Sequence, residues 1–147
     1  MRATVLTFAA CSAFWAVQAA AQEDAPIVPE ITPGNGLRIE VPSGQEVIWQ
    51  DVVWNVPGPD GMVLRFRFIA PGIAPDGGVE FETASADMQH LCDTFAVPRL
   101  SEFGTGPQQV VISLSATPVE FGVSAPEVVQ FFDSYLVEDG QCVWEMF

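Results

Sequence analysis

Alternating apolar and polar residues predict β-strands through much of the chain. Residues 62–70 place large apolar side chains on one side and the pair Arg65 and Arg67 on the other, which is the period-two pattern of a strand with one covered face. Residues 46–56 are rich in Val, Ile and Trp, and predict one long strand or a strand with a bulge near Gln50-Asp51. A turn rich in Pro and Gly joins the two runs into a predicted hairpin. Shorter runs predict strands at 37–41, 79–81, 108–115, 119–123 and 141–147.

Two other segments have the spacing of amphipathic helices. Residues 84–96 carry one apolar stripe, and Pro98 ends that helix soon afterwards. Residues 124–127 read Ser-Ala-Pro-Glu, which combines a serine cap, a proline in the first turn and a glutamate three residues after the cap. This pattern predicts a second helix that ends before 138–140. The two stripes consist of Met88, Leu91, Cys92 and Phe95, and of Val128, Phe131, Phe132 and Tyr135.

The order of these elements predicts a single α+β domain at 37–147. We expect an antiparallel or mixed sheet of about five to seven strands, with two helices packed on one face. Cys92 lies on the apolar stripe of the first helix and Cys142 lies on the last strand. One helix-to-strand disulfide therefore fits this arrangement.

The N-terminal residues have the three parts of a secretory signal peptide. Arg2 precedes an uncharged apolar run, and small residues surround the two candidate cleavage positions, after Ala21 or after Ala19. The apolar run is short for a membrane span, so we interpret 1–21 as a cleaved leader rather than an uncleaved anchor. Proline and glycine make 22–36 an extended or flexible lead-in. The sequence thus predicts a periplasmic or secreted protein whose mature chain has no integral membrane span.

The charge of the chain argues against several classes of partner. The sequence has 5 basic and 19 acidic residues, no lysine, and a net charge of −14. Loss of Arg2 with the leader would bring the net charge to −15. Nucleic acids and anionic lipids would be repelled by such a chain. The acidic residues form a solubilising surface or, alternatively, a patch for a basic partner or a loosely held cation.

Export also determines how the two remaining cysteines are interpreted. Cys92 and Cys142 are the cysteines outside the predicted leader, and disulfides form in oxidising compartments. Closing a loop of this length contributes about 4 kcal/mol in the chain-entropy treatment. A redox-active pair is the weaker alternative, because active dithiols are usually close together as Cys-x-x-Cys.

Candidate catalytic residues are few. His90 is the single histidine, so one chain cannot supply a zinc site with several histidines. Asp87 and Glu82 lie within one or two helical turns of His90 and could support acid–base chemistry, although a solvated helix face explains the same pattern. Nucleophile, phosphate-binding and calcium-binding motifs are missing. We therefore expect no cofactor, no metal and no catalytic residue.

Two further features could serve ligand binding. Arg65 and Arg67 form the one local basic pair, which could hold an anionic ligand or could pair with carboxylates on neighbouring strands. Large aromatic side chains are numerous and could line a groove, although packing in the core explains most of them. The tryptophans outside the leader are Trp49, Trp54 and Trp144.

Four stretches of the sequence resemble a family of short exported proteins of unknown function from alphaproteobacteria. The resemblance implies a location in the cell envelope and implies no catalytic residue. The stretches that carry it are Arg65–Pro71, Ser85–Cys92, Gln108–Leu114 and Cys142–Phe147.

These observations favour a non-catalytic exported domain that binds a protein or a small ligand. One alternative is a hydrolase that uses His90 with Asp87 or Glu82. Another is an acidic structural or assembly factor of the envelope, whose binding would weaken steeply with salt.

Overall fold

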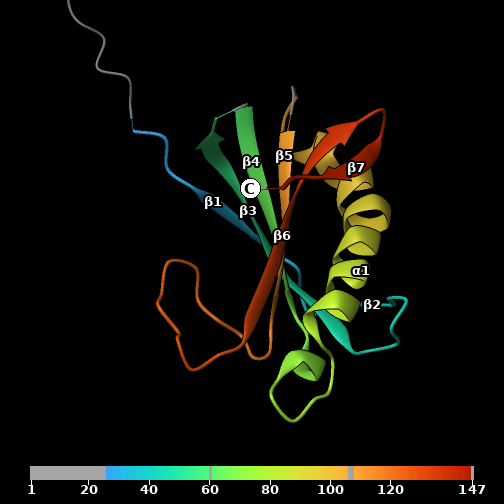
Figure 1. The fold of residues 1–147 in the computed structure, drawn as a ribbon. Helices are drawn as coiled ribbons and strands as arrows, with labels where there is room; N and C mark the ends of the chain where they lie inside the picture. The colour runs from blue at the N-terminus through green and yellow to red at the C-terminus, as the bar shows by residue number, and fades with distance from the viewer. Residues whose placement is uncertain (1–25, 60, 106–107, 147) are drawn as a thin grey trace, which may run out of the picture.

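The computed structural model describes residues 26–59, 61–105 and 108–146. These residues form one seven-stranded sheet, and a single long helical segment covers one of its faces (Figure 1). The strands follow the order β1-β3-β4-β5-β6-β7, and β2 also pairs with β3. The strand bounds are β1 Glu30–Pro33, β2 Arg38–Ile39, β3 Val47–Gly58, β4 Gly61–Ile69, β5 Gln108–Ser115, β6 Gln130–Glu138 and β7 Gln141–Trp144.

The sheet is mixed, because β4 and β5 are parallel while the other pairings are antiparallel. Parallel neighbours need a crossover connection, because the chain must return to the end from which it started. A short 3-10 turn, η1 (Pro71–Ile73), and the long helical segment provide this crossover. The crossover carries the helical segment across one face of the sheet and leaves the other face open (Figure 1).

The core lies between the helical segment and the sheet. Phe66 and Phe68 on β4 are neighbours of Ile112 and Leu114 on β5, and all four side chains are fully buried. Met88 on the helix belongs to the same buried cluster. The apolar half of the alternation in β4 therefore faces the helix, as the sequence predicts.

The helical segment is longer than the predicted 84–96. It comprises α1 (Phe81–Leu91), a π-helical turn η2 (Cys92–Ala96) and a 3-10 turn η3 (Val97–Phe103). Pro98 does not end the segment, because it occupies the first turn of η3, where a missing N–H costs little.

The predicted α+β class with two helices is wrong, since the described residues are mostly sheet and include one long helical segment. The residues expected to form the second helix are turns up to about 129 and then strand β6. Phe131 and Tyr135 are four residues apart, a spacing that places two side chains on the same face of a strand as well as on the same face of a helix. Both lie on the helix-covered face, where Tyr135 is opposite Val110 and Phe131 is opposite Leu114. Pairing with β5 overrides the local capping signal.

Smaller differences concern the short strands. The stretches 79–81 and 119–123 do not form strands, because Phe81 begins α1 and the second stretch belongs to the connection before β6. The predicted hairpin is present as β3 and β4, with a register irregularity between Trp49 and Asp51. Within the lead-in at 22–36, β1 pairs with β3. The predicted signal peptide, residues 1–21, lies outside the described residues.

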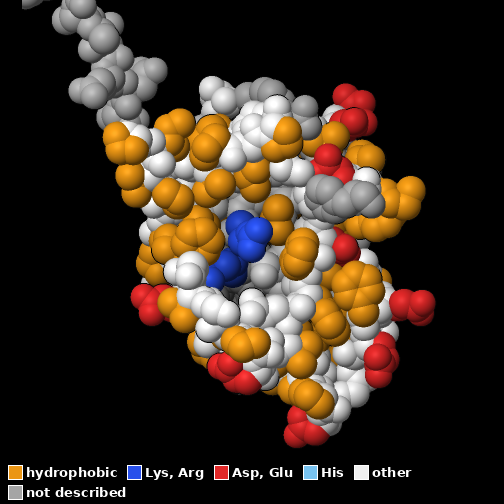
Figure 2. Space-filling view, turned by 60° about the vertical axis from the view of Figure 1, so that its left-hand side comes forward, with side chains coloured by type: hydrophobic (Ala, Val, Ile, Leu, Met, Phe, Trp, Pro, Cys, Tyr) orange, Lys and Arg blue, Asp and Glu red, His pale blue; other side chains and the backbone are white. Residues whose placement is uncertain are grey.

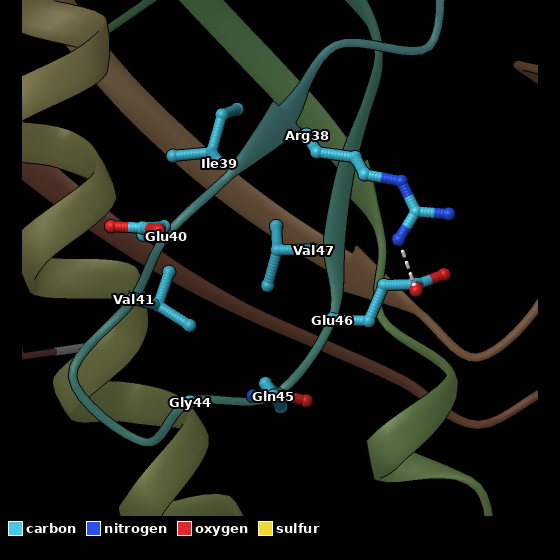
Figure 3. Close-up of a pocket in the computed structure, with 8 residues that line it drawn as sticks. All are labelled: Arg38, Ile39, Glu40, Val41, Gly44, Gln45, Glu46 and Val47. Carbon is cyan, nitrogen blue, oxygen red and sulfur yellow. Dashed lines mark hydrogen bonds and ion pairs between the residues drawn. The ribbon is translucent and has the colours of Figure 1, made fainter.

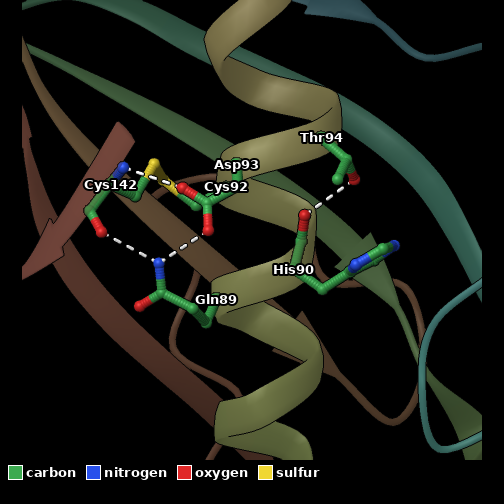
Figure 4. Close-up of a disulfide and its surroundings, with 6 residues drawn as sticks. All are labelled: Gln89, His90, Cys92, Asp93, Thr94 and Cys142. Carbon is green, nitrogen blue, oxygen red and sulfur yellow. Dashed lines mark hydrogen bonds between the residues drawn. A yellow bond between two sulfur atoms is a disulfide. The ribbon is translucent and has the colours of Figure 1, made fainter. Parts of the chain in front are cut away.

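The predicted disulfide between Cys92 and Cys142 is present and joins the helical segment to β7, with 6.1 Å between the two Cα atoms (Figure 4). Two helical side chains bind the backbone of Cys142 as well. Its N–H donates to Asp93 Oδ1 (2.8 Å), and its carbonyl accepts from Gln89 Nε2 (2.9 Å). The outer edge of β7 is therefore partly closed by the helix, which limits pairing with a further strand.

None of the helices among the described residues has the length and apolar character needed to cross a membrane.

Candidate functional site

One face of the sheet is not covered by the helical segment, and we call it the open face. It carries both arginines of the pair identified in the sequence. Arg65 is opposite Val53 on β3 and Val111 on β5. Arg67 is two residues further along β4, on the same face. Figure 2 looks onto this side of the molecule and shows basic side chains in a hollow that is surrounded by apolar ones.

Arg67 is fully engaged within the protein. Its Nε and Nη2 atoms donate to the two carboxylate oxygens of Asp51 at 2.7 and 2.5 Å, and both side chains are about nine-tenths buried. Nη1 donates to the carbonyl oxygen of Val119 (3.0 Å), and the guanidinium lies 5.5 Å from the centre of the Phe121 ring. Arg67 therefore anchors the β5–β6 connection to one end of the open face.

Arg65 differs from Arg67 because it has no ion pair and no side-chain hydrogen bond with any of the described residues. Burial lowers the pKa of Arg65 by disfavouring the charged guanidinium, and the positive charge of Arg67 lowers this pKa further. An arginine nevertheless keeps its proton in proteins. The open face thus holds one cation that the described part of the chain does not neutralise.

Exposed apolar side chains lie on both sides of this cation, toward the two edges of the sheet. Phe132 on β6 is 58% exposed, and Val143 on β7 is 44% exposed. On the opposite side of the face, Ile31 on β1 is 50% exposed and is opposite Val53 in the register. Because these side chains lie on strands, their positions are fixed by the sheet. The arrangement suits a ligand that combines an anionic group with apolar parts.

A small polar cluster borders Arg65 on the β5–β6 side. Gln109 Nε2 donates to Ser134 Oγ (3.0 Å) and to Glu145 Oε2 (2.5 Å), and Ser134 Oγ donates to the same carboxylate oxygen (3.0 Å). In the register, Ser134 is opposite Val111, which is itself opposite Arg65. Glu145 is thus occupied by neutral donors and forms no ion pair with Arg65.

A separate pocket of about 610 Å³ lies at β2 and the start of β3 (Figure 3). Arg38 and Glu46 form an ion pair there. Unlike Arg65, the cation of this pocket already has a partner, so the pocket offers no uncompensated positive charge to a ligand. Its lining residues are Arg38, Ile39, Glu40, Val41, Gly44, Gln45, Glu46 and Val47.

The structure does not join His90 to Asp87 or Glu82, since no hydrogen bond or ion pair between these side chains is formed. Asp87 is buried and accepts hydrogen bonds from the N–H and hydroxyl of Ser43 and from Gln45 Nε2, so it fixes the β2–β3 connection on the helix. The imidazole of His90 points away from the disulfide (Figure 4). Among the described residues, no group of three or more His, Cys, Asp or Glu side chains could hold a metal ion.

Aromatic side chains mainly serve the core rather than a groove. The Trp49 ring packs edge-on against Phe95, and Trp54 packs against Phe103. Trp144 is about half exposed and donates from Nε1 to Asp133 (3.3 Å). The tryptophans therefore lie on or beside the helix-covered side of the sheet.

Sequence reasoning found the two arginines but missed the apolar residues of the open face. The sequence predicts Phe132 on the apolar stripe of a helix, whereas in β6 it lies on the open face, on the opposite side from Tyr135. A period-two reading of 130–137 is the signal that would have placed Phe132 on the other face from Phe131.

The fold and the open face define a single-sheet domain with one helix-covered face and one face that presents a cation among apolar side chains. The chain belongs to the Family of unknown function (DUF6497), whose model matches residues 11–147. Comparison with curated proteins gave no match. Comparison with solved structures gave none either.

Proposed function

We propose that the protein is a non-catalytic binding domain and that the open face is its binding surface. The observation that carries this proposal is Arg65, a partly buried cation without an ion pair among the described residues. Burying a charge without a partner is costly. A ligand carboxylate or phosphate would offset that cost. Binding would therefore stabilise the charge of Arg65, which has no partner in the free protein.

The neighbouring residues support binding at this position rather than at the β2–β3 pocket. In the pocket, Arg38 is paired with Glu46, and its side chain is largely exposed to water. On the open face, Asp51 neutralises Arg67 and leaves the charge of Arg65 available. The exposed rings and aliphatic groups around Arg65 would lose contact with water when a partner binds, which adds a hydrophobic contribution.

We also propose that the protein acts outside the cytoplasm, in the periplasm or as a secreted protein. The leader-like residues 1–21 support this location. The bond between Cys92 and Cys142 supports it independently, because disulfides persist in oxidising compartments. An origin in alphaproteobacteria is part of the same proposal.

Site-specific photo-crosslinking of the full chain, expressed in a bacterial host with its leader, tests the binding surface. A photoreactive phenylalanine replaces Phe132 on the open face or, as the matched control, Phe81, a 47% exposed ring at the start of α1. We expect crosslinked products from position 132 and their loss when Arg65→Glu is added. Equal crosslinking from both positions, or products from position 132 that survive Arg65→Glu, would contradict the proposal.

A further inference from the structure

We infer that the occupant of the open face is a polypeptide segment that places one carboxylate over Arg65, apolar side chains against the surrounding residues, and basic side chains near the margin of the face. This inference rests on the proposed function and specifies the chemistry of the partner. Three features of the open face support it: the charge at its centre, the exposed apolar residues on both sides of that charge, and the acidic residues nearby.

The charge of Arg65 at the centre of the open face matches a single carboxylate. Arg65 and Arg67 are two residues apart on the same face of β4, and Asp51 already binds Arg67 through both of its oxygens. One positive charge is therefore left over, not two. A guanidinium presents parallel N–H donors that match the two oxygens of a carboxylate.

Exposed apolar residues lie on both sides of Arg65. Phe132 and Val143 lie toward β7, and Ile31 lies at the β1 edge, with more than two-fifths of each side chain exposed. Adjacent strands are about 4.8 Å apart, so these groups span the full width of the sheet. A compact anion such as acetate would reach Arg65 alone, whereas a polypeptide segment can also cover the groups on either side.

Nearby acidic residues favour a polypeptide over a lipid surface or a nucleic acid. Glu120 is exposed and follows Val119, whose carbonyl binds Arg67. Glu138 is exposed at the end of β6, on the strand that carries Phe132. The whole chain has a net charge of −14, which repels surfaces with many negative charges. A polypeptide can combine a central carboxylate with flanking lysine or arginine residues and so match both features.

Selection of random short peptides displayed on phage, with the disulfide-bonded protein as target, tests the inference. We expect the selected peptides to share an Asp or Glu among apolar residues, with Lys or Arg nearby. Synthetic copies should bind Arg65→Gln at least tenfold more weakly and should bind Arg38→Gln, a matched arginine outside the open face, as they bind the wild type. Changing the shared acid to Lys should restore binding to Arg65→Glu.

The outcomes separate the inference from the proposed function. Peptides that need Phe132 and Val143 but share no acidic residue would overturn the inference and leave the open face as the binding surface. Peptides that bind Phe132→Asp as strongly as the wild type would overturn the proposed function itself. Failure to select any peptide, together with Arg65-dependent binding to vesicles of phosphatidylglycerol, would overturn the inference in favour of a lipid surface. Failure of both the peptide and the vesicle arms would overturn the inference and the proposed function.

Discussion

Asp51 on β3 binds Arg67 on β4 through both oxygens of its carboxylate, at 2.7 and 2.5 Å. The pair neutralises one of the two arginines of the open face. It also holds Arg67 where Nη1 can bind the carbonyl oxygen of Val119 in the β5–β6 connection. This ion pair therefore determines both the charge of the open face and the position of the connection at its end.

Replacing Asp51 with Asn should lower the free energy of unfolding by about 3 kcal/mol, because it leaves a largely buried guanidinium without a counter-charge. Urea unfolding followed by tryptophan fluorescence measures the change. The double variant Asp51→Leu with Arg67→Met removes both charges together and should be much closer to the wild type. A loss in Asp51→Asn of less than about 0.5 kcal/mol, the usual range for surface substitutions, would show that the pair contributes little.

Replacing Arg65 with Met should have the opposite effect on stability. The variant removes a partly buried cation that lacks an ion pair among the described residues, and we expect a gain of about 1 kcal/mol together with the loss of binding on the open face. Such a combination identifies a residue retained for function rather than for folding. Arg38→Met, at an exposed arginine, is the control and should change stability by less than about 0.5 kcal/mol. A destabilised Arg65→Met protein would contradict this account of the open face.

The parts of the fold that follow from local pattern were predictable from the sequence. Alternation in 62–70 correctly separated the buried Phe66 and Phe68 from Arg65 and Arg67, because each strand residue faces the side opposite its neighbour. The prediction of a second helix is wrong because the capping signal at 124–127 is local. The conformation of 130–138 is instead determined by pairing with β5 and β7. The strand partner is distant in sequence, and a local signal cannot reveal it.

The pairing of Arg67 with Asp51 was not predictable from the sequence for a more specific reason. Trp49 is opposite Phe68, and an uninterrupted register would then place Gln50 opposite Arg67 and Asp51 on the helix-covered face. The irregularity between Trp49 and Asp51 shifts the register by one residue and brings Asp51 opposite Arg67 instead. A bulge near Gln50-Asp51 is compatible with the sequence, but its position to one residue decides whether Asp51 lies opposite Arg67 or on the other face of the sheet.

The disulfide and the side-chain contacts around Cys142 make separable contributions. Replacing both Cys92 and Cys142 with Ala should lower the free energy of unfolding by about 4 kcal/mol, because the unfolded chain is no longer closed into a loop. The N–H of residue 142 should nevertheless stay protected from hydrogen exchange in the folded double variant, since Asp93 still accepts its hydrogen bond. Asp93→Ala with the disulfide intact should expose the same N–H. Equal protection in both variants would mean that Asp93 does not hold β7.

His90 is expected to be dispensable. Its side chain forms no hydrogen bond or ion pair with the described residues, and only its backbone carbonyl accepts a hydrogen bond, from Thr94 (2.7 Å). His90→Ala should therefore change the free energy of unfolding by less than about 0.5 kcal/mol and leave binding of the selected peptides unchanged. Loss of peptide binding in this variant at unchanged stability would place His90 in the binding surface and contradict the assignment to the open face.

Tyr135 provides a titration that reports on the core, because it is the single tyrosine of the chain. Burial raises the pKa of its phenol above the ordinary value, and the carboxylates of Asp133 and Asp93 raise it further. The unfolded phenol ionises near pH 10, so the stabilising effect of this shift is complete below about pH 10. It is lost as the pH rises from there through the folded-state pKa.

The phenolate absorbance band should therefore be absent from the folded protein somewhat above about pH 10, where it is present for the urea-unfolded chain. The hydroxyl is buried and has no hydrogen-bond partner among the described residues, so Tyr135→Phe should fold with equal or higher stability at neutral pH. Its stability should also fall less steeply above about pH 10. A folded wild-type protein whose phenol ionises near the ordinary pKa would show that the contact between β6 and the helical segment opens to water.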